Sequence, residues 1–160
     1  MPHINDFIDF TVEVFIVFGD RVLLRRHDKY GIWLSIGGHI EPREDPNEAA
    51  IREVREEVGI DVRLDDSLRT FDRHTQGYVE LIPPYFLNRH RIDEGHEHVT
   101  LTYFALAASE RLSPTNGIER SSACRWFTRE QVESSDELDD RVRHYALKAL
   151  TTLAKPTRSR

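Results

Sequence analysis

The sequence predicts an α/β fold in which a mixed sheet lies between helices. Two observations support this prediction. Strand-like stretches precede and follow one helix with strong capping residues, and a long amphipathic helix is expected over residues 136–153. The chain has 160 residues, of which 39% are hydrophobic, and we therefore expect a single domain over residues 1–160 with one sizeable core. Residues 155–160 are basic and polar, and are expected to form a flexible tail.

Strand patterns occupy much of the remaining chain. Residues 11–18, TVEVFIVF, become apolar throughout, as expected of a strand that is covered on both faces. Residues 85–95 follow two prolines and are expected to form a long loop that carries arginine and histidine. The other strands are expected at residues 21–26, 33–36, 78–82, 98–108 and 123–127, with one or two more within residues 61–73.

The helix with the clearest boundaries is predicted from Pro46 to Val58. Asp45 is a favourable N-cap, Pro46 stands at the first helical position, where no N–H is needed, and Gly59 suits the left-handed conformation just beyond a helix. The apolar residues of this helix share one side and are expected to face the core: Ala50, Ile51, Val54 and Val58.

Glu53, Glu56 and Glu57 share another face of this helix, because residues three and four positions apart are neighbours on a helix. A solvated surface is the ordinary explanation for a run of charges. A divalent cation explains it better here, because Mg²⁺ prefers carboxylate oxygens and often shares its coordination with substrate phosphates. The preceding glycines, Gly37 and Gly38, would allow a sharp turn that brings a backbone carbonyl close to such an ion.

The pattern formed by Gly38, Glu44 and the run from Arg52 to Ile60, REVREEVGI, resembles the Nudix box of the Nudix hydrolase family, with every defining position filled. The resemblance implies an α/β/α sandwich and a pyrophosphohydrolase. Such an enzyme uses Mg²⁺, for which Mn²⁺ can substitute, to hydrolyse a phosphoanhydride bond in a nucleoside diphosphate that is linked to another moiety.

Two other activities on this fold stay open. A non-hydrolytic nucleotide-sensing module is one, although it would favour a degraded box, and the box here is intact. An isoprenoid diphosphate isomerase is the other and ranks last, because the resemblance requires a cysteine ahead of the box, whereas Cys124 lies after it.

The resemblance also implies which residues of the box hold the metal. Glu56 and Glu57 are expected as ligands, Glu53 as a third ligand or as the general base, and Gly38 as the donor of a carbonyl oxygen. Arg52 is expected to orient a glutamate side chain in the catalytic site.

The general base is not fixed by the box. Cleavage of a phosphoanhydride needs a positioned water whose proton a nearby carboxylate accepts. In some relatives a glutamate from a later loop takes this role, and Glu119 is the candidate for it, with Glu94 and Glu97 as weaker ones. Glu44 is expected to support the loop or the metal.

Substrate contacts are expected outside the box. His96 and His98 alternate along a strand and therefore point to the same face, and together with Arg89 they are candidates to bind a substrate phosphate. A zinc site at His96-Glu97-His98 is disfavoured, because no third soft ligand stands at a recognisable spacing. Tyr78 is a candidate to stack on a base, at a position similar to that of a tyrosine in diadenosine polyphosphate hydrolases.

Composition limits the partners and the compartment. The net charge is −6, from 28 acidic and 22 basic residues, which argues against a nucleic-acid-binding surface. The sequence shows neither an apolar run of membrane-spanning length nor a signal-peptide pattern, and its single cysteine excludes an internal disulfide. We therefore expect a cytoplasmic protein that acts on a small nucleotide derivative, without a membrane or nucleic-acid partner, and we leave a homodimer open.

Overall fold

The computed structural model describes residues 4–27, 30–113 and 123–154. Its main sheet is formed by β1 (Ile8–Phe18), β2 (Arg21–Arg26), β3 (Trp33–Leu34), β4 (Ile36–His39), β5 (Val62–Leu64), β8 (Phe86–Asp93), β9 (His96–Ala107) and β10 (Cys124–Thr128). A separate hairpin is formed by β6 (His74–Thr75) and β7 (Tyr78–Val79), and the helices are α1 (Pro46–Val58), α2 (Arg129–Ser134) and α3 (Asp140–Leu153). None of the helices within these ranges is long and apolar enough to cross a membrane.

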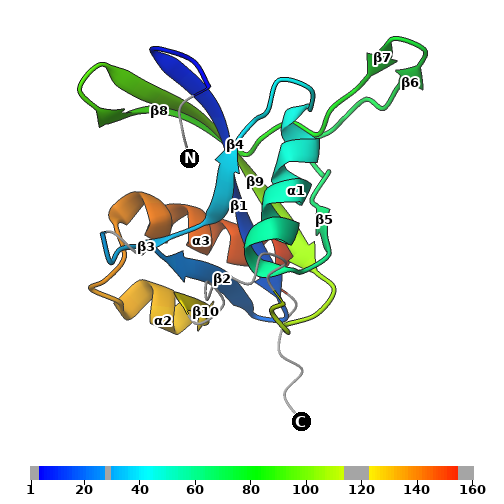
Figure 1. Ribbon diagram of the computed structural model, residues 1–160. Helices are drawn as coiled ribbons and strands as arrows, with labels where there is room; N and C mark the ends of the chain where they lie inside the picture. The colour runs from blue at the N-terminus through cyan, green and yellow to red at the C-terminus, as the bar shows by residue number, and fades with distance from the viewer. Residues whose placement is uncertain (1–3, 28–29, 114–122, 155–160) are drawn as a thin grey trace.

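The sheet is built on a central parallel pair, β1 and β9 (Figure 1). The strand order is β10-β2-β1-β9-β5. Two further strands pair with the N-terminal parts of the central strands: β4 pairs antiparallel with β1, and β8 pairs antiparallel with β9. Strand β8 and the strand ends beside it extend beyond the helices and are called here the β8–β9 arm, whereas β4 packs against α1 (Figure 1).

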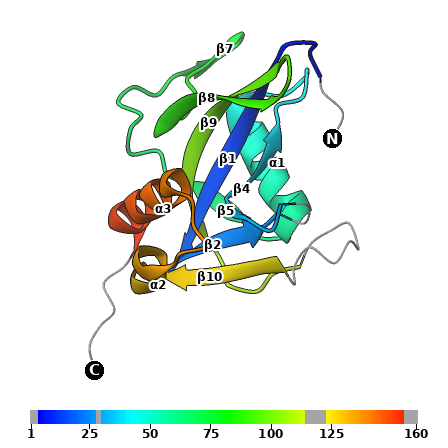
Figure 2. The same cartoon turned by 90° about the vertical axis from the view of Figure 1, so that its left-hand side faces the viewer.

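Helices cover both faces of the sheet, with α1 on one face and α2 and α3 on the other (Figure 2). Alternation along β1 divides the core accordingly. Val14 and Ile16 pack with α1, whereas Phe15 and Val17 pack with α2 and α3. The α/β/α sandwich is thus confirmed, and so is a β1 strand that is buried on both faces.

The boundaries of α1 are confirmed as the sequence predicts them. The Asp45 carboxylate accepts hydrogen bonds from the backbone N–H groups of Asn47 at 2.8 Å and Glu48 at 2.9 Å, and the Glu48 carboxylate accepts one from the Asp45 N–H at 3.0 Å. Gly59 ends the helix with φ 64°. This reciprocal cap satisfies backbone donors that would otherwise lack partners inside the helix.

Replacing Asp45 by alanine is expected to lower the free energy of unfolding by about 1 kcal/mol, the usual value for loss of an N-cap. Urea unfolding followed by circular dichroism measures this change. Asp72→Ala is the matched control, because the Asp72 side chain is 70% exposed. Equal stability of the two variants would show that the cap contributes nothing to the fold.

Two local predictions are wrong. Residues 85–95 are not a loop, because Phe86–Asp93 forms β8 and pairs along its length with β9. Gly37 and Gly38 do not form a turn: they lie within β4 and pair with Glu13 and Val12 of β1. The partner of β4 is the distant strand β1, so that the local pattern did not reveal the pairing. Strand β8 instead forms a hairpin with the adjacent β9, and its own residues lack the apolar alternation of a typical strand.

Candidate active site

A pocket of about 210 Å³ opens on the face of the sheet that carries α3. The same side of β1 that buries Phe15 beneath the helices presents Thr11 and Glu13 to this pocket. Strand β9 repeats the pattern, with Phe104 in the core and Thr100 in the pocket. The pocket therefore lies where this sheet face changes from apolar to polar.

An ion pair between Arg141 and the buried Glu13 closes one side of the pocket. Glu13 is 7% exposed, and Nη1 of Arg141 on α3 donates to its two carboxylate oxygens at 3.2 and 3.0 Å. The hydroxyls of Ser35 and Thr102 also donate to Glu13, at 2.9 and 2.7 Å. Arg141 lines the pocket and is 36% exposed, so that it brings positive charge to a ligand there.

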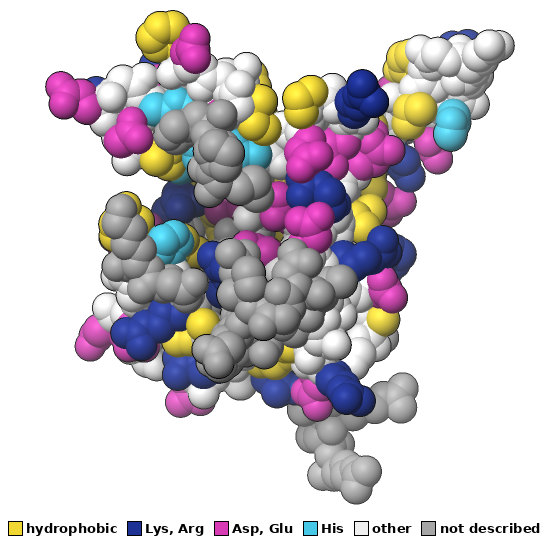
Figure 3. All heavy atoms as spheres, viewed as in Figure 1, with side chains coloured by type: hydrophobic (Ala, Val, Ile, Leu, Met, Phe, Trp, Pro, Cys, Tyr) yellow, Lys and Arg dark blue, Asp and Glu magenta, His cyan; other side chains and the backbone are white. Residues whose placement is uncertain are grey.

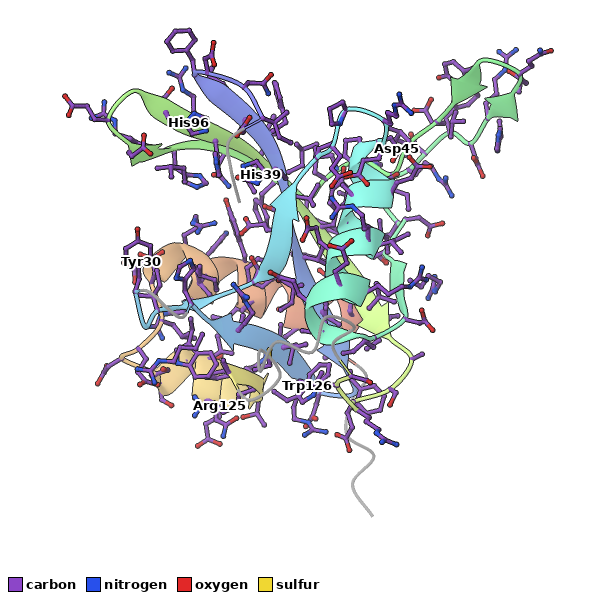
Figure 4. All side chains as sticks on the ribbon, viewed as in Figure 1. Tyr30, His39, Asp45, His96, Arg125 and Trp126 are labelled. Atoms are coloured by element: carbon purple, nitrogen blue, oxygen red, sulfur yellow. The ribbon has the colours of Figure 1, made fainter. Side chains whose placement is uncertain are left out.

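Histidines gather at the other side of the pocket. His39 on β4, His90 on β8 and His98 on β9 line it, and the ring centroids of His39 and His90 lie 4.9 and 5.8 Å from that of His98. His96 is buried beside this group, and its Nε2 lies 3.3 Å from Oδ2 of Asp9, while Nε2 of His39 lies 3.1 Å from the same oxygen. Figure 4 labels His39 on β4 and His96 on the β8–β9 arm.

The electrostatics of this group follow from its burial and hydrogen bonds. Burial opposes ionisation of Asp9, but N–H donors from Ile4 and Asn5 outweigh it and lower the pKa of Asp9 to about 2. Burial, and next the neighbouring imidazoles, lower the pKa of His98 to about 4. At neutral pH the cluster therefore holds a carboxylate beside a neutral His98 ring.

Arg52 connects a carboxylate that precedes α1 with two carboxylates of the helix itself. Its guanidinium donates two hydrogen bonds to Glu44, at 2.9 and 2.6 Å, one to Glu53 at 2.9 Å and one to Glu56 at 3.3 Å. It also donates to the backbone carbonyl of His39 at 2.9 Å, which ties α1 to β4. The hydrogen bonds from Arg52 lower the pKa of Glu44 below its usual value.

Two of the three box glutamates are buried against β4. Glu53 is 2% exposed, its carboxylate lies directly against Gly38, and its burial raises its pKa. Glu57 is 8% exposed; it accepts a hydrogen bond from the Gly37 N–H at 3.3 Å and lies 3.4 Å from Nη1 of Arg25. Burying carboxylates is costly unless positive charge or hydrogen-bond donors accompany them.

This donor set fits a divalent cation. Glu53 and Glu57 are buried next to one another on α1, and the side chain of Glu56 is 45% exposed beside them, so that the available donor atoms are carboxylate oxygens of the kind that Mg²⁺ prefers. Gly38 leaves the space that the Glu53 carboxylate occupies, since a Cβ at this position would overlap it. That Glu53, Glu56, Glu57 and the Gly38 carbonyl bind a metal stays a prediction.

The pocket and the box glutamates meet at the two glycines. Gly37 and Gly38 line the pocket, and each also contacts a glutamate of α1. Among the described strands, β4 pairs with β1 alone. The other edge of β4 therefore has no strand beside it and lies between the pocket and α1. Figure 3 shows histidines gathered on the β8–β9 arm and acidic side chains beside arginines over α1. The pocket therefore adjoins the carboxylates of the box.

Other residues predicted for the site are not brought to the pocket. Arg89 is exposed and pairs with Glu97, because alternation along β8 directs it away from the face that carries His90. Tyr78 is exposed on the β6–β7 hairpin and hydrogen-bonds to Glu80. Glu119 and the expected tail at 155–160 lie outside the described residues. The weaker candidate Glu97 is engaged with Arg89 on the arm.

Four residues that the structure brings to the pocket or to its edge were not predicted from the sequence: Asp9, Glu13, His39 and Arg141. Only Glu13 carried a usable signal. A glutamate in the middle of an apolar strand must find a buried partner, because an unpaired charge in a core is strongly unfavourable.

Comparisons with known proteins agree with the fold. The family profile described as NUDIX domain matches residues 9–149. A solved hydrolase of the NUDIX family from Clostridium perfringens is 32% identical, with a TM-score of 0.77 and a match that covers 93% of this chain and 99% of that one.

Two curated relatives match shorter segments. The CTP pyrophosphohydrolase of Escherichia coli is 30% identical over 77 residues, which cover 48% of this chain and 57% of the relative. The NAD-capped RNA hydrolase NudC of Pseudomonas entomophila is 46% identical over 52 residues, which cover 31% of this chain and 19% of the relative. The chain therefore spans less than two thirds of the length of either relative.

Proposed function

This chain belongs to the Nudix hydrolase family, and we propose that it is a Mg²⁺-dependent pyrophosphohydrolase that cleaves a phosphoanhydride bond in a nucleoside diphosphate linked to another moiety. The observation that supports this most directly is the meeting of the box carboxylates with the polar pocket at Gly37 and Gly38. The names of the relatives, which include a CTP pyrophosphohydrolase, support the same reaction class.

The box residues position the reaction in this proposal. Glu56 and Glu57 hold the cation, and Glu53 is its third ligand or the general base. Arg52 fixes Glu53 and Glu56 through the hydrogen bonds given above, so that little motion is needed when substrate binds. A divalent cation held there neutralises phosphate charge and makes a bound water easier to deprotonate. Glu119 stays a prediction for the base.

The pocket binds the remainder of the substrate in this proposal. Arg141 faces a phosphate, and His98 and Thr100 supply uncharged polar groups on the opposite side of the pocket. Arginine suits this role because its planar guanidinium recognises phosphate with several N–H donors. Specificity would then come from the pocket and the β8–β9 arm rather than from the exposed Tyr78.

Two arginine variants test where the phosphate binds. Arg141→Ala is expected to raise KM about tenfold, since a hydrogen bond to a charged group contributes roughly 1.5–3 kcal/mol. Arg89→Ala is the matched control and is expected to change KM less than about twofold, because Arg89 points away from the pocket. Steady-state kinetics measure both, and thermal unfolding shows whether Arg141→Ala still folds. Equal KM values for the two variants would remove Arg141 from the binding site.

A substrate panel tests the proposed reaction. Nucleoside triphosphates including CTP, dinucleoside polyphosphates, ADP-ribose, NADH and sugar nucleotides are incubated with the full chain and Mg²⁺, with Mn²⁺, or with a chelator. We expect hydrolysis of at least one compound that stops when the chelator is present. Nucleotide binding without hydrolysis of any compound, under either metal, would instead indicate a sensing module.

The cellular setting is part of the same proposal. We place the enzyme in the cytoplasm, because its single cysteine suits a reducing compartment and its proposed substrates are small nucleotides. A homodimer stays a prediction, which sedimentation velocity of the purified chain would check.

A further inference from the structure

Three strands bring Asp9, His39 and His98 together at the histidine side of the pocket. Asp9 lies opposite His98 in the parallel β1–β9 pair, and His39 lies two residues further along, opposite Thr11 in the β1–β4 pair. One ligand atom from each of the three residues lies within 4.8 Å of the other two. We propose that these three residues form a second metal site, which binds a first-row transition metal ion such as Zn²⁺.

The donor atoms distinguish this site from the box. Two imidazole nitrogens and one carboxylate oxygen are a common zinc-binding set, whereas the box offers carboxylate oxygens, which suit Mg²⁺. The two sites are therefore expected to select different ions from a mixture. They are also linked through His39, whose side chain belongs to the second site while its backbone carbonyl accepts a hydrogen bond from Arg52 of the box.

The carboxylate is already held in place for this role. Asp9 is fully buried, and its Oδ1 accepts hydrogen bonds from the backbone and side chain of Asn5 at 2.7 and 3.1 Å. Its Oδ2 faces the imidazoles of His39 and His96. Such hydrogen bonds around a ligand typically set its orientation and strengthen metal binding.

To bind one ion, the three ligand atoms must move slightly closer to one another. Zinc ligands at about 2.0–2.2 Å from the ion stand about 3.3 Å apart in a tetrahedron. Oδ2 of Asp9 and Nε2 of His39 are 3.1 Å apart, so that this pair needs almost no movement. His98 then has to approach from within 4.8 Å, which rotation of its side chain can supply.

The position left open by three protein ligands faces the pocket. His39 and His98 both line the pocket, as does Arg141 on its other side. An oxygen of an anionic ligand in the pocket would complete the coordination, as water or substrate does in zinc sites with three protein ligands. The second metal would thus hold the part of the ligand that extends away from the box.

Metal titration of the full chain tests the site independently of any hydrolytic activity. The chelator-treated protein is titrated with Zn²⁺ by calorimetry in excess Mg²⁺, which occupies the box, and with Co²⁺ by visible absorption. We expect about one Zn²⁺ per chain and a Co²⁺ spectrum with imidazole ligation. Absence of Zn²⁺ binding in excess Mg²⁺ would overturn the proposal.

Variants identify the ligands. Asp9→Asn and His98→Ala are expected to weaken Zn²⁺ binding at least about 100-fold, more than the loss usually seen when a supporting hydrogen bond is removed. His74→Ala removes an exposed histidine on the β6–β7 hairpin, and Glu56→Gln alters the box; both should bind Zn²⁺ as the unmodified chain does. Unchanged affinity in Asp9→Asn and His98→Ala would overturn the assignment.

X-ray absorption of the zinc-loaded chain keeps the test decisive if a variant fails to fold. The expected spectrum contains scattering from two imidazoles, with nitrogen and oxygen neighbours at about 2.0–2.2 Å. A shell of oxygen atoms without imidazole scattering would place the ion at the glutamates and contradict the proposal.

Discussion

Glu56→Gln is expected to lower kcat by at least about 100-fold, the scale of loss when metal-assisted catalysis is disabled. Glutamine keeps the shape of the side chain but replaces a charged oxygen donor by a neutral amide, which binds Mg²⁺ less well. Because the Glu56 side chain is 45% exposed, this change should leave the fold intact, whereas changes at the buried Glu53 or Glu57 combine catalytic and structural effects.

Glu48→Gln is the matched control for this experiment. It makes the same substitution on the same helix, and glutamine at this position can still complete the capping box. We expect normal kcat for Glu48→Gln and a higher Mg²⁺ requirement for Glu56→Gln, measured by initial rates across a Mg²⁺ series. If both variants hydrolyse substrate at the rate of the unmodified chain, the metal assignment at the box is wrong.

The parts of the site that the sequence predicts are those encoded by neighbouring residues. Asp45, Pro46 and Gly59 set the ends of α1 through backbone hydrogen bonds and conformations within a few residues. The helical repeat then places Glu53 and Glu57 on the same side of α1. Their burial against β4 distinguishes this side from an ordinary solvated acidic face.

The pocket depends on contacts between distant residues, and the sequence predicts little of it. Glu13 and Arg141 are 128 positions apart, and no local pattern indicates that α3 returns to β1. The same holds for Asp9 and His98, which become neighbours only when β1 and β9 pair in parallel. His39 was not predicted for another reason: it lies between Gly38 and Glu44, where the box pattern specifies no residue.

The mistaken loop at residues 85–95 has a physical cause. Only one face of β8 is covered, and the half-buried positions of that face include Asn88 and His90, so that the usual apolar alternation is absent. Pairing with β9 supplies the backbone hydrogen bonds that make the segment a strand. The half-buried face of β8 is polar because it lies against the pocket.

Gly38→Ala is expected to lower kcat by about 100-fold, because a shift of about 1 Å in a catalytic group can have an effect of that size. A Cβ at this position overlaps the Glu53 carboxylate, which is the movable end of a side chain, so that Glu53 is displaced while the backbone stays. At Gly37, by contrast, a Cβ would overlap the backbone of Val12 and Glu13 in β1. Gly37→Ala should therefore lower the free energy of unfolding by about 1–3 kcal/mol, the usual cost of overpacking, and Gly38→Ala by less.

A double-variant cycle shows whether the loss in Gly38→Ala passes through Glu53. If the alanine acts by displacing that carboxylate, adding it to a Glu53→Gln chain should cost little more, about twofold, because the group it disturbs is already disabled. Independent effects would multiply instead, and the double variant would lose the product of the two single factors. A product of that kind, measured with both single variants folded, would mean that Gly38 serves the reaction through its own backbone or through the pocket, and not by making room for Glu53.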